Sequence, residues 1–253
     1  MYYGRHITTI IPALNEESAI GKVIDQLRAF TAMGQPVIDR ILVCDNGSSD
    51  DTKAVAVYHG AEVVVEPERG YGAACLKAIA AVTQTDILLF VNGDGSEVVG
   101  EIPLVLAPLI LENADLVVGS RTLGQSEPGA LSPHQLFGNR LAVFLMRLIW
   151  RDPVTDLGPF RAIRFDVYLQ LNMIDRNYGW TIEMQLKALR QRRRVIEVPV
   201  TALPGKTPSR VSGTLRGCIG AAYKILGLIF MYGIMETISS VNSRQRRIEK
   251  RNQ

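Results

Sequence analysis

The chain has 253 residues, of which 47% are hydrophobic and 21% charged, a composition typical of a globular protein with a substantial core. The formal net charge of +3 is too small to indicate a nucleic-acid partner, although the final segment SRQRRIEKRNQ is strongly basic. The three cysteines and three histidines are scattered, so neither a disulfide framework nor a zinc motif is indicated. The apolar stretch in MYYGRHITTIIPAL is too short for a signal peptide, and we expect a cytoplasmic protein.

In the first half of the chain, short β-branched segments alternate with longer amphipathic ones, which predicts βαβ units and a mostly parallel sheet flanked by helices. The predicted strands are residues 6–13, 37–45, 61–67, 85–94 and 114–121. The runs ILVC and ILLFV are apolar throughout, which indicates strands that are covered on both faces. Because α/β sheets bind ligands at the carboxyl ends of their strands, the residues after each strand are the candidates for chemistry.

The second half is less regular. We predict helices over 134–151 and 180–194, a strand over 194–200 and a long helix over 213–240. We divide the chain into a catalytic domain, residues 1–211, and a C-terminal amphipathic helix with a basic tail, residues 212–253. The apolar stretch between Lys224 and Glu236 is shorter than the ~20 residues that span a bilayer, so this helix either packs on the domain or lies at a membrane surface.

Polar or glycine-rich residues follow every predicted strand of the first half. Asn15, Glu16 and Asp45 offer oxygens that can accept hydrogen bonds from a base or a ribose. A purely structural alternative remains, in which Asn15 caps a helix and Asp45 stabilises a turn. In RGYGAACLKA, Gly70 permits close approach of a ligand, but Cys75 replaces the later glycine of a dinucleotide fingerprint.

Asp94 follows the apolar run ILLFV and stands between two glycines. A carboxylate at this position supplies a hard oxygen ligand for a divalent cation, whose coordination phosphates and water complete. The cation would neutralise charge on a departing nucleoside diphosphate. An Asx turn is the structural alternative. We therefore predict that Asp94 is a metal ligand and a catalytic residue.

The segments IIPALNEE, VCDNGSSDDT, RGYGAA, VNGDGS and ADLVVGSR occur together in this order. In order and spacing they resemble the inverting family 2 glycosyltransferases, particularly the polyprenyl-phosphate (dolichyl-phosphate) sugar synthases. The resemblance extends over about residues 5–215. It implies a glycosyltransferase A-type fold (the nucleotide-diphospho-sugar transferase fold), a nucleotide-sugar donor, and Mg or Mn as the divalent cation.

The resemblance also implies roles for positions near the donor. Nucleoside-binding positions match Pro12, Ala13, Glu16 and Asp45, and Asp94 matches the second carboxylate of the family's DxD motif. The predicted nucleotide-sugar-binding residues are Pro12, Ala13, Asn15, Glu16, Asp45, Gly70, Asn92 and Gly93.

One position departs from the family pattern. The first carboxylate of the DxD motif is Asn92 here, and because an amide is neutral the cation loses one charge interaction. Ser96 is close enough in sequence to join the ligands. We predict a cation site formed by Asp94, Asn92 and Ser96, with weak Mg binding or reliance on Mn.

The nature of the acceptor decides whether a base is needed. A hydroxyl must be deprotonated, and VTDLGPFRAI and YGWTIEMQ offer Asp156 and Glu183 for that role. A phosphate monoester, with a second pKa of about 6, is already anionic and needs cations instead. VTDLGPFRAI is similar to the family's segment that carries an aspartate before SGFR, which singles out Asp156 and Arg161. For Glu183 a surface ion pair with Lys187 is the structural alternative. The predicted acceptor-phosphate residues are Arg121, Arg140, Lys206 and Arg210, and Arg121 is also a predicted catalytic residue.

These observations favour an enzyme that transfers a hexose, with inversion, from a UDP- or GDP-linked sugar to a polyprenyl phosphate or other lipid-linked acceptor. The basic loop before the hydrophobic helix suggests peripheral attachment at the inner face of the cytoplasmic membrane. Asn92 leaves a second reading open, a catalytically silent nucleotide-sugar binder acting as a sensor or assembly partner. A sugar-phosphate nucleotidyltransferase is disfavoured because IPALNEES lacks its glycine-rich signature. Homo-oligomerisation is left open.

Overall fold

The structure, a computed structural model, describes residues 1–206, 220 and 223–236. Its strands are β1 (Ile7–Ala13), β2 (Thr31–Ala32), β3 (Gln35–Pro36), β4 (Arg40–Asp45), β5 (Glu62–Val65), β6 (Ile87–Phe90), β7 (Leu116–Ser120), β8 (Arg161–Arg164) and β9 (Val195–Pro199). Its helices are α1 (Ile20–Ala29), α2 (Thr52–Tyr58), α3 (Tyr71–Ala80), the 3-10 helix η1 (Val99–Glu101), α4 (Ile102–Leu111), α5 (Pro133–Trp150), α6 (Phe165–Leu171) and α7 (Trp180–Arg190). Residues 223–236 are also helical.

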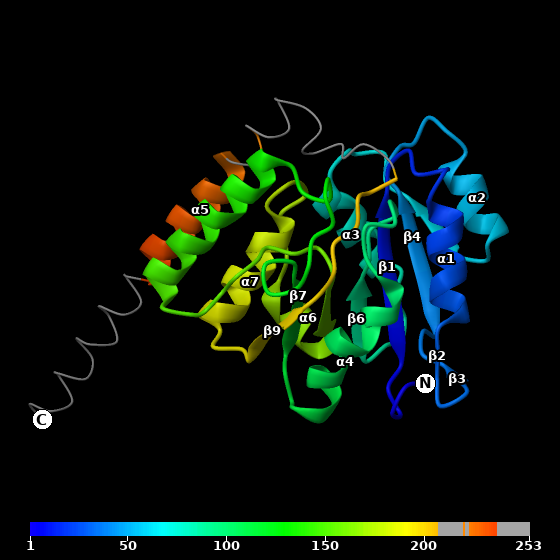
Figure 1. Ribbon diagram of the computed structural model, residues 1–253, viewed down its shortest axis with the longest axis horizontal. Helices are drawn as coiled ribbons and strands as arrows, with labels where there is room; N and C mark the ends of the chain where they lie inside the picture. The colour runs from blue at the N-terminus through cyan, green and yellow to red at the C-terminus, as the bar shows by residue number, and fades with distance from the viewer. Residues whose placement is uncertain (207–219, 221–222, 237–253) are drawn as a thin grey trace, which may run out of the picture.

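The main sheet has seven strands in the order β5-β4-β1-β6-β8-β7-β9 (Figure 1). All neighbours pair in parallel except β8, which runs antiparallel to both β6 and β7. The predicted fold class, a mostly parallel sheet flanked by helices, is therefore confirmed. The strand β8 is not among the predicted strands, because its sequence RAIR is short and its partners lie far away along the chain.

Alternate side chains of each central strand pack into separate cores on the two faces of the sheet. Ile11 of β1 contacts the cluster that α1, α2 and α4 cover. Ile10, the preceding residue, belongs to the cluster that α3, α6 and α7 cover. Burial on both faces explains why the central strands are apolar throughout.

A third apolar cluster joins α5, α7 and the helix of residues 223–236. Its buried members include Met146, Ile182, Ile229 and Tyr232. The C-terminal helix thus packs on the domain through one face. Among the described residues, no helix is both long and apolar enough to cross a bilayer.

The predicted helix over 134–151 agrees with α5, whose start is fixed by a capping box between Ser132 and Gln135. The predicted helix over 180–194 is too long. α7 ends at Arg190, and Arg192 takes a left-handed conformation with φ of 55°. A run of arginines has good helix propensity, so the sequence alone extends the helix past the point at which the chain turns into β9.

The glycines at the start of α3 make room for the protein's own backbone. A Cβ atom on Gly70 would lie 2.1 Å from the carbonyl oxygen of Arg176, and one on Gly72 would lie 2.1 Å from that of Asp175. The segment just before α7 therefore packs directly on α3. The sequence predicts that Gly70 permits close approach of a ligand. In the structure it permits close approach of the Arg176 backbone.

We predict that Gly72→Ala lowers the free energy of unfolding by about 1–3 kcal/mol, because the new methyl group meets rigid backbone. Gly138→Ala is the matched control. Gly138 lies inside α5 with nothing within 4 Å of the new Cβ, and helix propensity should make this variant more stable by up to ~1 kcal/mol. Urea unfolding of both variants checks this. Equal stability of Gly72→Ala and the wild type would contradict the packing.

Candidate active site

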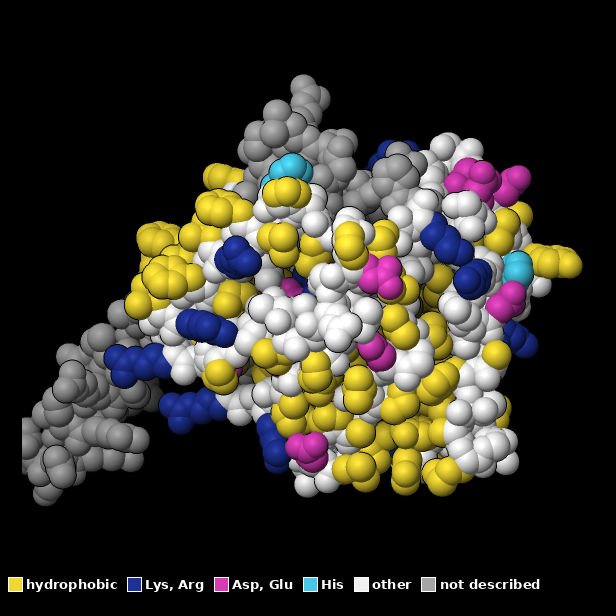
Figure 2. Space-filling model, viewed as in Figure 1, with side chains coloured by type: hydrophobic (Ala, Val, Ile, Leu, Met, Phe, Trp, Pro, Cys, Tyr) yellow, Lys and Arg dark blue, Asp and Glu magenta, His cyan; other side chains and the backbone are white. Residues whose placement is uncertain are grey.

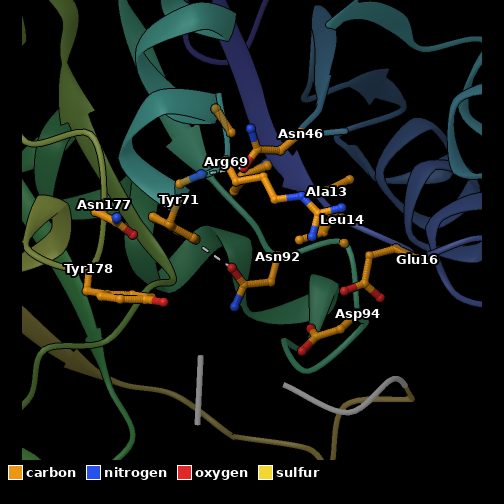
Figure 3. Close-up of a pocket in the computed structure, with 14 residues that line it drawn as sticks. Ala13, Leu14, Glu16, Asn46, Arg69, Tyr71, Asn92, Asp94, Asn177 and Tyr178 are labelled. Atoms are coloured by element: carbon orange, nitrogen blue, oxygen red, sulfur yellow. Dashed lines mark hydrogen bonds between the residues drawn. The ribbon is translucent and has the colours of Figure 1, made fainter. Parts of the chain in front are cut away.

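A cavity of about 560 Å³ opens where the carboxyl ends of β1, β4 and β6 meet (Figure 3). The parallel register places Ala13 beside Asp45 and Ile10 beside Phe90, so the loops after the three strands lie at one edge. The cavity is lined by Pro12, Ala13, Leu14, Glu16, Asn46, Arg69, Gly70, Tyr71, Ala74, Asn92, Gly93, Asp94, Asn177 and Tyr178. Of the predicted donor-site residues, only Asn15 and Asp45 are missing from this lining.

Asn15 and Asp45 instead hold loops together. The Asn15 side-chain oxygen accepts a hydrogen bond from the Ser49 amide at 2.8 Å, and the Asn15 amide donates to Ser48 Oγ at 2.9 Å. Asp45 is buried, and its Oδ1 accepts from the Ser48 amide at 3.1 Å. The observed hydrogen bonds of Asn15 and Asp45 agree with the structural alternative, in which these side chains stabilise loops. Asn15, however, joins two loops and does not cap a helix.

Asn46, which the sequence analysis overlooked, fixes the loop that leads into α3. Its side-chain NH2 donates to the carbonyl oxygens of Glu66 and Glu68 at 2.9 and 2.7 Å, and its side-chain oxygen accepts from the Gly70 amide at 2.7 Å. Arg69, immediately before Gly70, also lines the cavity and contributes a positive charge to it. Both belong to segments already identified in the sequence, Asn46 to VCDNGSSDDT and Arg69 to RGYGAA, so the signal that could have found them was present.

The carboxylate of Asp94 faces the cavity on the same side as that of Glu16 (Figure 3). The Ser96 amide donates to Asp94 Oδ1 at 3.0 Å, which fixes a tight turn. A Cβ atom on Gly93 would lie 3.4 Å from Glu16 Cγ, so the loops after β1 and β6 lie side by side. The predicted Asx turn is thus present, and it holds the Asp94 carboxylate at the cavity, where its role as a cation ligand stays a prediction.

Asn92, where the family pattern has a carboxylate, turns its side-chain oxygen toward Tyr71. The Tyr71 hydroxyl donates to it over a long 3.5 Å (Figure 3). Tyr71 is half-buried at the cavity wall, and the loss of hydration there raises its pKa well above the ordinary value. The uncharged side-chain oxygen of Asn92 therefore accepts a hydrogen bond from a hydroxyl group that keeps its proton.

The chain segment that ends at Lys206 runs along the Asp94 loop. The Leu203 amide donates to the Ser96 carbonyl at 2.9 Å, and the Lys206 amide donates to the Asp94 carbonyl at 3.1 Å. The structure thus brings Lys206, a predicted phosphate-binding residue, next to the predicted cation ligand. Arg210 lies outside the described residues.

Glu97 is a carboxyl group that the sequence analysis did not single out. Its Oε2 accepts a hydrogen bond from the backbone amide of Asn92 at 3.2 Å. Its Oε1 is shielded from solvent and has no hydrogen-bond partner within the part of the chain that is described. Burial, followed by the charge of Asp94, raises the pKa of Glu97 to about 8, against the opposing influence of the Asn92 amide and Arg121.

Asp156 is fully engaged by Arg121. Arg121 Nε and NH2 donate to the two carboxylate oxygens at 2.8 Å each, and the Arg121 amide donates to Oδ2 at 2.8 Å. The Asp156 side chain is only 1% exposed. Both oxygens accept hydrogen bonds from Arg121 and the side chain is almost fully shielded from solvent, which disfavours the predicted role of Asp156 as a base. The pair also neutralises much of the Arg121 charge predicted to meet phosphate.

Glu183 is likewise unsuited to be a base. It is 1% exposed, accepts hydrogen bonds from the amides of Ile174 and Asp175, and pairs with Lys187 at 2.8 Å. The ion pair with Lys187 predicted as the structural alternative is present, although it is buried rather than on the surface. Glu183 holds the turn before α7 and does not line the cavity.

Comparisons with known proteins identify the family. Residues 8–171 match the family described as Glycosyl transferase family 2. The chain belongs to this family. It is 37% identical over 221 residues to an uncharacterised glycosyltransferase of Mycobacterium tuberculosis, covering 85% of this chain and 94% of that one. Glycosyltransferase AglJ of Haloferax volcanii is 28% identical over 199 residues, covering 78% of this chain and 63% of AglJ.

A solved structure shares the fold of this family 2 glycosyltransferase. Glucosyl-3-phosphoglycerate synthase from Mycobacterium tuberculosis, solved with Mn2+ and UDP-glucose, superposes with a TM-score of 0.71 at 24% identity. The match covers 90% of this chain and 79% of the synthase. This likeness confirms the predicted glycosyltransferase A-type fold.

The other predicted acceptor residues of the glycosyltransferase lie in different settings. Arg140 is exposed on α5. It follows Asn139, whose side-chain oxygen accepts from the Leu157 amide at 3.0 Å. Arg161 is completely buried and donates to the carbonyl oxygens of Gly158 and Thr181, and burial lowers its pKa to about 10. Arg161 therefore pins the chain before β8 to α7 and is not available to a ligand.

The raised pKa of Glu97 predicts how stability depends on pH. The pKa of the Glu97 carboxyl has its ordinary value of 4.5 in the unfolded chain and rises to about 8 in the folded protein, so folding favours the protonated form. Stability is lost as pH rises from 4.5 through 8. We expect Glu97→Gln to gain stability relative to the wild type over that range, measured as thermal midpoints at a series of pH values.

Glu62→Gln is the matched control for this prediction. Glu62 pairs with Arg40 on the surface, and the hydrogen bond from Arg40 lowers its pKa. Its stabilising effect is present above its unfolded pKa, so Glu62→Gln should lose a little stability at neutral pH. A gap between Glu97→Gln and the wild type that stays constant with pH would contradict the prediction.

Proposed function

We propose that this glycosyltransferase moves a hexose from a nucleoside-diphosphate sugar to a phosphate group, and that the phosphate belongs to a polyprenyl phosphate or other lipid. The donor end rests on the cavity, in which backbone and side chains after β1 face the carboxylate of Asp94. The related synthase binds UDP-glucose, so a UDP-linked donor is the first choice and a GDP-linked one the second.

A divalent cation fits the Asp94 loop. Asp94, with Ser96 and the neutral Asn92 nearby, offers hard oxygen ligands, as Mg2+ and Mn2+ require. No group of three or more His, Cys, Asp or Glu side chains that could hold a metal occurs among the described residues. The donor diphosphate would therefore complete the coordination, and the cation would stabilise the leaving nucleoside diphosphate. Lys206 and Arg69, which lie beside the loop and in the cavity, add positive charge for the same phosphates.

The observation that carries the choice of acceptor is the engagement of both predicted bases. Asp156 is held by Arg121, and Glu183 by two backbone amides and Lys187. A sugar or lipid hydroxyl would need a free base to remove its proton. A phosphate monoester is already anionic near neutral pH and attacks without one. This favours a phosphate as the nucleophile.

A lipid as the carrier of that phosphate is supported by apolar surface on the helical side of the molecule. Exposed apolar side chains gather over α5 (Figure 2). The exposed large apolar residues of α5 and of the C-terminal helix are Leu136, Phe137, Phe144, Leu148, Tyr223, Phe230, Met231, Ile234 and Met235. Apolar patches of this kind mark protein or membrane contacts, and we assign this one to peripheral contact with a bilayer.

The test is a transfer assay with purified protein, Mn2+ and radiolabelled UDP-glucose. Acceptors are vesicles with polyprenyl phosphate, vesicles with the matching polyprenol, and 3-phosphoglycerate in solution. We expect label in polyprenyl phosphate alone, joined with inverted anomeric configuration. Asp94→Asn should lower the rate by about 100-fold or more.

Each other outcome has a definite meaning. Transfer to 3-phosphoglycerate alone would reject the lipid, and it would also reject the phosphate argument if the sugar were joined to the free hydroxyl of that acceptor and not to its phosphate. Transfer to polyprenol would reject the phosphate argument. Saturable binding of UDP-glucose without release of UDP would favour a catalytically silent sugar-nucleotide binder. A parallel panel with GDP-mannose tests the second choice of donor.

Asn92→Asp restores the carboxylate of the family pattern and should tighten Mn2+ binding in the presence of UDP on the order of tenfold, because a second anionic ligand joins the site. Isothermal titration measures the affinity. Tyr71→Phe is the control, since it removes the long hydrogen bond to Asn92 without adding charge. Unchanged Mn2+ affinity in Asn92→Asp would show that this side chain does not face the cation.

A further inference from the structure

The turn before α7, residues 174–179, is built on two buried carboxylates. Glu183 accepts from the amides of Ile174 and Asp175, the latter at 2.8 Å. Asp175 Oδ1 in turn accepts from the amides of Asn177 and Gly179 at 2.8 and 3.1 Å. Four of the six backbone amides of the turn therefore donate to a carboxylate.

Each of the two carboxylates is neutralised by a lysine from a different helix. Lys187 of α7 pairs with Glu183 at 2.8 Å, and Lys224 of the C-terminal helix pairs with Asp175 Oδ2 at 2.9 Å. The burial of the second pair is unequal, because the Asp175 side chain is 3% exposed and that of Lys224 47%. Without its partner the lysine could be hydrated, whereas the aspartate could not.

The C-terminal helix touches the same turn at two further points. A Cβ atom on Gly220 would lie 3.4 Å from Tyr178 Cε2. One on Gly179 would lie 2.4 Å from Leu228 Cδ1, so Gly179 makes room for that leucine. The turn is therefore held between this helix on one side and the start of α3, through Gly70 and Gly72, on the other.

Asn177 and Tyr178, at the centre of the turn, line the cavity and lie on the far side of it from Glu16 and Asp94 (Figure 3). With the nucleoside at the β1 end and the diphosphate at Asp94, the part of the donor left for this wall is the sugar. An amide and a phenol suit a neutral hexose, since both can exchange hydrogen bonds with hydroxyl groups and the ring can cover apolar C–H edges.

We propose that Asp175 and Lys224 are positioning residues that hold the Asn177–Tyr178 wall in place to receive the sugar of the donor. The proposal rests on the proposed function. Loss of the Lys224 ammonium leaves a buried charge on Asp175, and the turn must open to hydrate it. The C-terminal helix thereby contributes to donor binding although it lies outside the cavity.

The test compares dissociation constants of UDP-glucose and UDP, measured by isothermal titration with Mn2+. We expect Lys224→Met to weaken UDP-glucose about five- to tenfold and UDP less than twofold, because only the sugar meets the wall. Asp175→Asn alone should have little effect, since the amide keeps its oxygen acceptor and the exposed Lys224 is hydrated. The double variant Asp175→Asn with Lys224→Met should recover the wild-type affinity, since no buried charge remains.

Glu236→Gln is the matched control. Glu236 pairs with Arg190 at 3.8 Å and ties the same helix to α7 far from the turn. The Glu236→Gln variant should bind UDP-glucose and UDP with the same affinities as the wild type. Wild-type binding of UDP-glucose by a folded Lys224→Met protein, equal weakening of UDP and UDP-glucose, or failure of the double variant to recover would each overturn the proposal.

Amide hydrogen exchange separates this proposal from the donor assignment. If the wild type bound neither UDP nor UDP-glucose, the donor proposal would fail, but exchange within residues 174–179 would still report on the turn. Faster exchange in Lys224→Met that returns to the wild-type rate in the double variant supports positioning by the ion pair. Unchanged exchange in Lys224→Met overturns it.

Discussion

The parallel pairing of β1 with β4 and β6 is the constraint on which the site depends. Because Ala13 pairs with Asp45 and Ile10 with Phe90, the loops after three separate strands leave the sheet at one edge. The loops after β1 and β6 lie side by side there, with Gly93 next to Glu16. Asp94 is brought to the cavity by this arrangement, and the turn closed by the Ser96 amide then orients its carboxylate.

Buried carboxylates around the cavity serve mainly to hold backbone. Asp156 with Arg121, Glu183 with Lys187 and Asp175 with Lys224 each combine an ion pair with hydrogen bonds from main-chain amides. Such a charge is tolerable in a protein interior only if it is both paired and hydrogen-bonded. Glu97 has no cation bonded to it among the described residues, and burial, followed by the charge of Asp94, raises its pKa. This occupation of the carboxylates is the basis of our proposal that the acceptor is already anionic.

The strand pattern and the residues at the strand ends predicted much of the donor side. Pro12, Glu16, Gly93 and Asp94 line the cavity as expected, because their positions follow from local β-strand signals and parallel pairing. The strand β8 was overlooked, since its antiparallel pairing to β6 and β7 depends on contacts distant in sequence. Glu97 was overlooked as well, because nothing in NGDGSE shows that its carboxyl group is shielded from water.

Amino-acid order alone was enough to establish the fold class, the family and the carboxylate after β6, since these depend on periodic burial and on short motifs. It could not show which carboxylates are free. Asp156 and Glu183 look like bases in sequence, yet their availability depends on Arg121, Lys187 and main-chain amides brought in by packing. The wall formed by Asn177 and Tyr178 arises in the same way, because the chain before α7 reaches the cavity only once it packs against α3 and the C-terminal helix.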